Sequence, residues 1–198
     1  MKVALPAALV AGLALSAPAL AADPDGRFAL RSLATLNCGQ IVATIEQSGA
    51  EELQALVTQL SIWLGGYLTH ANRTTPDVFD VVPFGAERDV LAVVVNRCEQ
   101  LPPETNFEAT VAQVVALLEP LSVPSESPMR SFDGALPMRE SMVIRVQERL
   151  IEFGHLAGSA DGVVGPLTRQ ALQAFQAERG LDETAVLDLD VFLLLMAD

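Results

Sequence analysis

The side chains that most often carry out chemistry in proteins, cysteine and histidine, are scarce in this chain. The chain holds two cysteines, Cys38 and Cys98, and two histidines, His70 and His155. A metal site needs several such ligands at close spacing, and these four residues are isolated from one another. A serine triad needs a histidine, and His155 is the only histidine in residues 138–198. The composition therefore predicts no catalytic residues, no metal and no cofactor.

The N-terminal residues have the pattern of a secretory signal peptide. Lys2 precedes a run of apolar residues, and the small residues Ala19 and Ala21 stand before a plausible cleavage point. We therefore expect residues 1–21 to be removed, which leaves an exported protein with no membrane span. Prolines and a glycine inside the run argue against the alternative, a retained membrane helix.

The two cysteines are expected to form a disulfide, because an even number of cysteines in an exported protein most simply means pairing. A bond between Cys38 and Cys98 would close a loop of about 60 residues and stabilise the fold by roughly 4 kcal/mol in the chain-entropy model. The alternative, a metal site, lacks further ligands nearby.

The charge balance limits the classes of partner. The chain has 25 Asp and Glu against 12 Lys and Arg, a net charge of −13. Nucleic acids and anionic membrane surfaces are bound through clustered basic residues. The acidic excess therefore argues against both as partners.

Residues 120–137 divide the chain. They contain four prolines and four serines in eighteen positions, a composition typical of a flexible linker. Residues 22–119 are then expected to form one domain and residues 138–198 a second.

The first domain has the pattern of an all-helical fold. Its longest expected helix carries apolar side chains three and four residues apart on one face: Leu53, Leu56, Leu60, Trp63 and Tyr67. Ser48 with Glu51, and Thr105 with Glu108, have the spacing of capping boxes at two helix starts. With shorter helices around the two cysteines, the pattern predicts a small helical domain stapled by a disulfide.

The second domain has a turn followed by a helix at its centre. Asp161 and Gly162 are turn residues, and Gly165 precedes Pro166, which is suited to a first helical position. A helix before this segment and a short one after it complete the pattern. Three short helices around one core are the economical fold for so short a segment, so the whole chain is expected to be all-α.

The second domain resembles the peptidoglycan-binding module of type 1. The positions in step with that family are Val146, Gln147, Leu150, Gly154, Asp161, Gly162, Gly165, Thr168, Ala171, Phe175, Gln176, Gly180 and Leu181. The resemblance implies a three-helix fold and binding of peptidoglycan without catalysis. It implies a binding motif that consists of Gln147, Asp161, Gly162, Gly165, Thr168, Phe175 and Gln176. One departure is Ala185, where the family often has a glycine.

The first domain resembles the HdeA family of periplasmic acid-stress chaperones and the related immunity proteins of the Rap1a type. The resemblance rests on Cys38, the segment WLGGYL at residues 63–68, and Cys98 in RCEQLPPETNF. Relative to that pattern, an insertion at residues 70–87 lengthens the loop before the third helix.

Together these features predict a non-enzymatic periplasmic protein that binds peptidoglycan and carries a chaperone-like domain. In that case acid would protonate the carboxylates, loosen the helices and expose apolar faces to unfolded client proteins. The alternatives are an immunity or inhibitor protein that binds one specific partner through residues 70–87, and an accessory subunit of a wall hydrolase.

Overall fold

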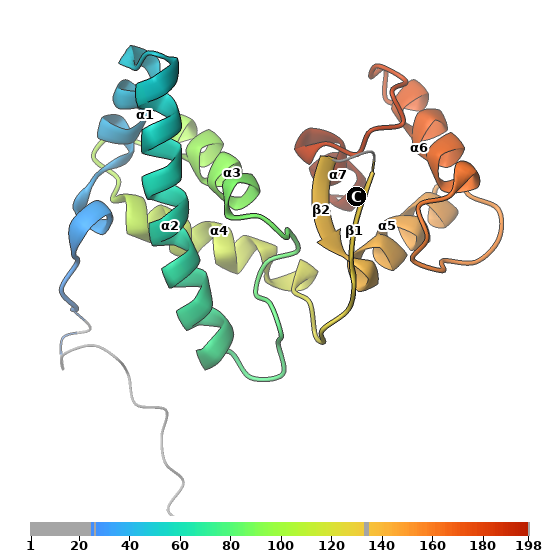
Figure 1. Ribbon diagram of the computed structural model, residues 1–198, viewed down its shortest axis with the longest axis horizontal. Helices are drawn as coiled ribbons and strands as arrows, with labels where there is room; N and C mark the ends of the chain where they lie inside the picture. The colour runs from blue at the N-terminus through green and yellow to red at the C-terminus, as the bar shows by residue number, and fades with distance from the viewer. Residues whose placement is uncertain (1–24, 26, 133–134, 198) are drawn as a thin grey trace, which may run out of the picture. The chain divides into compact units, whose positions relative to one another are not determined.

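The computed structural model describes residue 25, residues 27–132 and residues 135–197, and it is almost wholly helical (Figure 1). The expected signal peptide lies outside the described residues. Residues 32–198 group into one compact unit. Among the described residues, no helix is long and apolar enough to cross a membrane.

The first half of the unit contains four α-helices and two short 3-10 helices. Their bounds are η1 Ser32–Thr35, α1 Cys38–Gln47, α2 Ala50–Thr74, α3 Glu87–Gln100, α4 Phe107–Leu118 and η2 Glu119–Leu121. Helix α3 lies against α1, α2 and α4 (Figure 1). We call residues 32–118 the helical region.

The expected disulfide is present. Cys38 at the start of α1 is bonded to Cys98 near the end of α3, and both residues are buried. Around the bond the apolar faces of the helices meet, and the Trp63 ring on α2 lies 5.4 Å from the ring of the buried Phe107 on α4. The bond therefore joins two helices inside the core.

The helix starts differ from the expected capping boxes by one residue. Helix α2 begins after Gly49, whose N–H donates to the Glu52 carboxylate at 2.9 Å. The hydroxyl of Ser48 instead donates to the Thr44 carbonyl of the preceding helix. Helix α4 is capped by Asn106 and not by Thr105, because the Asn106 side chain accepts from the third helical N–H.

The segment expected to be a flexible linker contains ordered structure. Strands β1 (Met129–Phe132) and β2 (Ala135–Arg139) form an antiparallel hairpin. Val123, Phe132 and Leu136 are buried. The prolines do not prevent this, because a two-stranded hairpin has edge positions that tolerate a missing N–H. The segment for which the sequence predicted a flexible linker, residues 120–137, thus contributes two strands.

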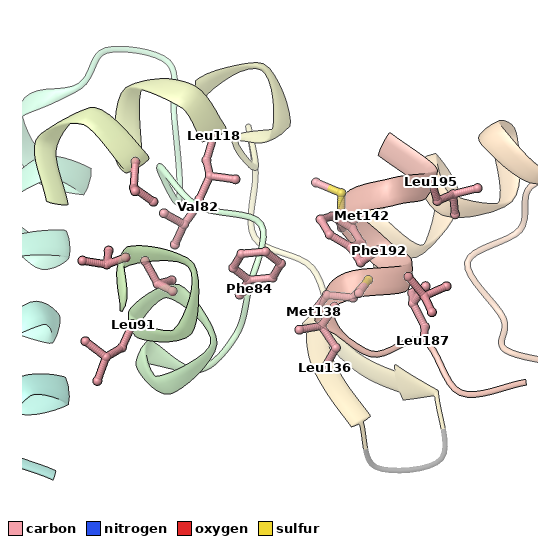
Figure 2. Close-up of a cluster of buried hydrophobic side chains, with 14 of the residues drawn as sticks. Val82, Phe84, Leu91, Leu118, Leu136, Met138, Met142, Leu187, Phe192 and Leu195 are labelled. Carbon is pink, nitrogen blue, oxygen red and sulfur yellow. The ribbon is translucent and has the colours of Figure 1, made fainter. Parts of the chain in front are cut away.

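The loop that precedes α3 packs within the chain. Val81, Val82 and Phe84 are buried, and the Phe84 ring meets the Phe192 ring edge-on at 5.3 Å (Figure 2). The Gly85 N–H donates to the Pro137 carbonyl at 2.6 Å. Residues 79–85 therefore link the helical region to the hairpin and to the last helix.

The C-terminal part holds the three helices that the sequence predicts. Their bounds are α5 Glu140–Glu152, α6 Pro166–Glu178 and α7 Leu189–Ala197. Their shared core is apolar, and its fully buried members include Val143, Val146, Leu150, Leu172, Phe175, Phe192 and Leu195. We call residues 139–197 the module.

Candidate functional site

A buried glutamine on α5 fixes the loop that leads into α6. Gln147 is 1% exposed, and its amide nitrogen donates to Oδ1 of Asp161 at 2.9 Å and to the carbonyl of Val163 at 3.1 Å. Its amide oxygen accepts from the N–H of Gly162 at 2.7 Å. The nitrogen also lies 3.1 Å from Oγ1 of Thr168, which is buried in the first turn of α6. One buried side chain therefore satisfies several polar groups of this turn.

Glycine is required at the centre of this turn. Gly162 has a φ of +74°, and a Cβ at this position would lie 2.5 Å from Cγ of Glu140. A side chain here would be strained in its backbone and would collide with α5. Gly165 plays a different part, because it stands at the N-cap of α6 with Pro166 after it.

A second buried glutamine repeats the same arrangement between α6 and α7. Gln176 is 1% exposed, and its amide nitrogen donates to Oγ1 of Thr184 at 3.2 Å and to the carbonyl of Val186 at 3.0 Å. Its amide oxygen accepts from the N–H of Ala185 at 3.0 Å. In each loop the third residue also donates its N–H to the side-chain oxygen of the first, Val163 to Asp161 and Val186 to Thr184.

The module is therefore built on two glutamine clamps, by which we mean Gln147 with residues 161–163 and Gln176 with residues 184–186. Sequence reasoning missed both clamps, because each glutamine is separated along the chain from the loop that it holds, by fifteen residues in one case and nine in the other. The signal that could have found them is a glutamine that follows a core residue, as in Val146-Gln147 and Phe175-Gln176.

Ala185 occupies the place of Gly162 in the second clamp. Its φ is +57°, in the left-handed region, yet it makes the same backbone hydrogen bond as Gly162. The departure from the family pattern therefore leaves the clamp's hydrogen bonds in place. It puts strain on one residue, because a Cβ is unfavourable at positive φ.

Most of the motif residues build the module and do not face solvent. Gln147, Gly162, Thr168, Phe175 and Gln176 are buried. Asp161 is exposed, and Gly165 is half-buried. The turn-forming role of Asp161 is confirmed by its bonds to Gln147 and Val163. Direct contact of this motif with peptidoglycan stays a prediction.

The exposed large apolar side chains of the module lie in α6 or in the loops next to it. Val163 is 56% exposed, Leu167 65% and Leu181 39%. Sequence reasoning missed Val163 as a surface residue, because a hydrophobic residue between two turn glycines reads equally well as part of a core. The first clamp holds the backbone of Val163, because it binds both the N–H and the carbonyl of this residue, while the side chain remains exposed.

The clamp changes the ionisation of Asp161. The hydrogen bond from Gln147, followed by that from the Val163 N–H, lowers the pKa of the Asp161 carboxyl. In the helical region the direction is opposite: burial raises the pKa of Asp80, Asp89 and Glu108. The two parts of the chain therefore respond differently to acid.

His155 is largely buried within the module. Its side chain is 14% exposed, lies edge-on to the Phe175 ring at 6.1 Å and places Nε2 2.9 Å from Oε2 of Glu178. It joins the end of α5 to the end of α6. No nucleophile accompanies it among the contacts that the structure describes, and groups of three or more metal-ligating side chains are absent from the described residues.

The helical region presents apolar grooves. One groove of about 350 Å³ lies between α1, α2 and α3, where its apolar lining includes Ile45, Leu53, Val57 and Leu91. Another of about 280 Å³ lies between residues 75–81 and α4, lined by Val78, Val81 and Val115. Grooves of this kind accept apolar side chains of other molecules.

Comparison with known proteins identifies one part of the chain. Residues 139–195 match the family described as "Putative peptidoglycan binding domain". No curated protein and no solved structure matches the chain. The C-terminal module is thus of the peptidoglycan-binding type, and the expected likeness of the helical region to acid-stress chaperones finds no support in these comparisons.

Proposed function

We propose that the chain is a non-enzymatic periplasmic protein in which the module binds peptidoglycan and the helical region binds other proteins. The proposal of wall binding rests on the family match of residues 139–195, in which both clamps are complete. A disulfide-bonded core supports a location outside the cytoplasm.

The protein-binding half is supported by the apolar grooves of the helical region. The loop at residues 70–87 is a weaker candidate for partner contacts, because Val81, Val82 and Phe84 are buried against the chain's own core. A chaperone that binds unfolded clients needs apolar surface of this type, and so does an inhibitor or immunity protein with one partner, or the accessory subunit of a wall hydrolase.

The acid-triggered form of the chaperone hypothesis meets a physical objection. Asp80, Asp89 and Glu108 have raised pKa values, so these carboxyls bind protons more tightly in the folded state than in the unfolded one. Their protonation therefore favours the folded helical region as the pH falls. We propose that clients bind to the folded grooves at neutral pH, without a requirement for acid unfolding.

Two experiments test the two halves. The full chain should pellet with purified peptidoglycan sacculi at pH 7, while an unrelated protein of similar net charge should stay in the supernatant. The full chain should also suppress light scattering by an aggregating client at pH 7. A pull-down from periplasm that yields one stoichiometric partner, without an effect on the client, would favour the inhibitor alternative. Clearing of a peptidoglycan zymogram would contradict the non-enzymatic assignment.

A further inference from the structure

One exposed side of α6 is uncharged over most of its length and partly apolar. Leu167, Gln170, Ala174 and Ala177 are exposed, and their spacing of three and four places them on one side of the helix. Val163, in the loop just before the helix, is also exposed, at 56%. We call these five residues the α6 face. The opposite side of the helix is buried in the module's core.

The exposed carboxylate of Glu178, four residues after Ala174, lies at the C-terminal end of this side, and the module around it is acidic. Residues 138–198 contain ten Asp and Glu against five Arg. The nearest acidic residue along the helix, Glu178, lies in its last turn and is paired with His155 at 2.9 Å. A ligand with free carboxylates would be repelled by the surrounding charge, whereas a neutral ligand would not.

Peptidoglycan offers one component of each kind. Its stem peptides carry free carboxylates, and its glycan strand is a run of N-acetylated sugars with amides, hydroxyls and methyl groups but no charge. The methyl groups can pack on Val163, Leu167 and Ala174, and the Gln170 amide can exchange hydrogen bonds with sugar amides and hydroxyls.

We propose that the module binds the glycan strand of peptidoglycan along the α6 face, an inference that rests on the wall-binding function proposed above. The first clamp supports this site, because it fixes the backbone of Val163 on both sides through Asp161 and Gln147. A surface that is ordered before binding loses less conformational entropy when the ligand arrives. The clamp residues of the family motif thus act as positioning residues, and the α6 face makes the contact.

The test compares two surface variants of the full chain. Leu167→Glu places a carboxylate on the α6 face, and Ile62→Glu is the matched control, because Ile62 is 73% exposed on α2. Both sites are exposed, so both variants should keep the thermal midpoint of the wild type, which circular dichroism checks. Binding is measured to whole sacculi and to bead-coupled chitin oligosaccharides, which are neutral runs of N-acetylglucosamine without stem peptides.

The proposal expects the wild type and Ile62→Glu to bind both materials, and Leu167→Glu to lose at least about tenfold in affinity for both. Equal binding by the wild type and Leu167→Glu would overturn the α6 face and leave the wall-binding function standing. Binding to sacculi but not to the chitin oligosaccharides would overturn the neutral N-acetylated glycan as ligand. If the wild type binds neither material, the proposed function fails and this inference fails with it.

Discussion

The helical region and the module both hold short helices together, but they use different bonds. In the helical region a covalent bond joins α1 to α3 across 60 residues of sequence. The module has no cysteine, and two buried glutamines tie its loops to its helices. A disulfide acts mainly on the unfolded chain, whereas a buried amide acts on the folded loop itself. The module therefore gains loop geometry as well as stability.

The two regions also differ in how they hold carboxyls. The helical region partly buries Asp80, Asp89 and Glu108, which raises their pKa values. The module leaves Asp161 exposed and hydrogen-bonds it, which lowers its pKa. Acid should therefore weaken the clamp of the module while it relieves a penalty in the helical region.

Removal of the disulfide should have the largest effect on stability. The double substitution Cys38→Ala and Cys98→Ala should lower the free energy of unfolding by about 4 kcal/mol, because the unfolded chain regains the entropy of a large loop. Urea denaturation followed by circular dichroism measures this. A loss below about 1 kcal/mol would mean that the bond contributes little and that the comparison with the clamps is misplaced.

Loss of the first clamp should have the second-largest effect on stability. Gln147→Leu leaves the buried Gly162 N–H without its acceptor, and we expect a loss of about 3 kcal/mol. The matched control is Gln173→Leu, an exposed glutamine on α6 whose substitution should change stability by less than about 0.5 kcal/mol. Thermal unfolding of both variants gives the comparison. Similar midpoints would show that the clamp is dispensable.

Substitution of Ala185 should change the stability by less, and in the opposite direction. Ala185→Gly should stabilise the chain by about 1 kcal/mol, because it removes a Cβ from a residue with a φ of +57°. The converse substitution, Gly162→Ala, should be destabilising, because its Cβ would also meet Glu140. Urea midpoints of the two variants should move in opposite directions. A shift of both in the same direction would contradict the equivalence of the two clamps.

The pH response should be the smallest effect, and its sign differs between the two regions. The stability that ionised Asp161 provides is present above the unfolded pKa of about 3.9 and is lost as the pH falls through the lower folded pKa. The advantage of the wild type over Asp161→Asn should therefore vanish in strong acid.

For Glu108 the sign is reversed, because burial raises the pKa of its carboxyl. The charged form destabilises the fold above the raised pKa, and the penalty disappears as the pH falls toward the unfolded value. The wild type should therefore be less stable than Glu108→Gln at neutral pH and approach it in acid. Thermal midpoints from pH 7 to pH 3 test both pairs. A wild type that gains on Asp161→Asn as the pH falls would contradict the account.

The sequence predicted what depends on local pattern. The apolar spacing in residues 53–67 predicted a helix, the cysteine count predicted the disulfide, and Asp161 with Gly162 predicted a turn. Helix caps were displaced by one residue, because Ser48 donates to the preceding helix and Asn106, next to Thr105, supplies the capping oxygen of α4.

What escaped prediction depends on tertiary contact. Phe84 is buried against Phe192, which lies far along the chain. The hairpin is ordered because Phe132 and Leu136 are buried in the core. Both clamps escaped prediction because each glutamine is separated along the chain from its loop, and in the second loop Ala185 also replaces the turn glycine of the first. Local sequence carries no signal for these long-range contacts, so composition alone suggested a linker and an open loop.

The most direct test of the account is the binding of the full chain to sacculi with and without the first clamp. The wild type should pellet with sacculi at pH 7, and Gln147→Leu should remain largely in the supernatant, because its 161–163 loop no longer holds Val163 in place. Both proteins should act equally on an aggregating client, since the grooves of the helical region are unchanged. If the wild type stays in the supernatant, or if both proteins pellet equally, the central claim of a clamped, wall-binding module is contradicted.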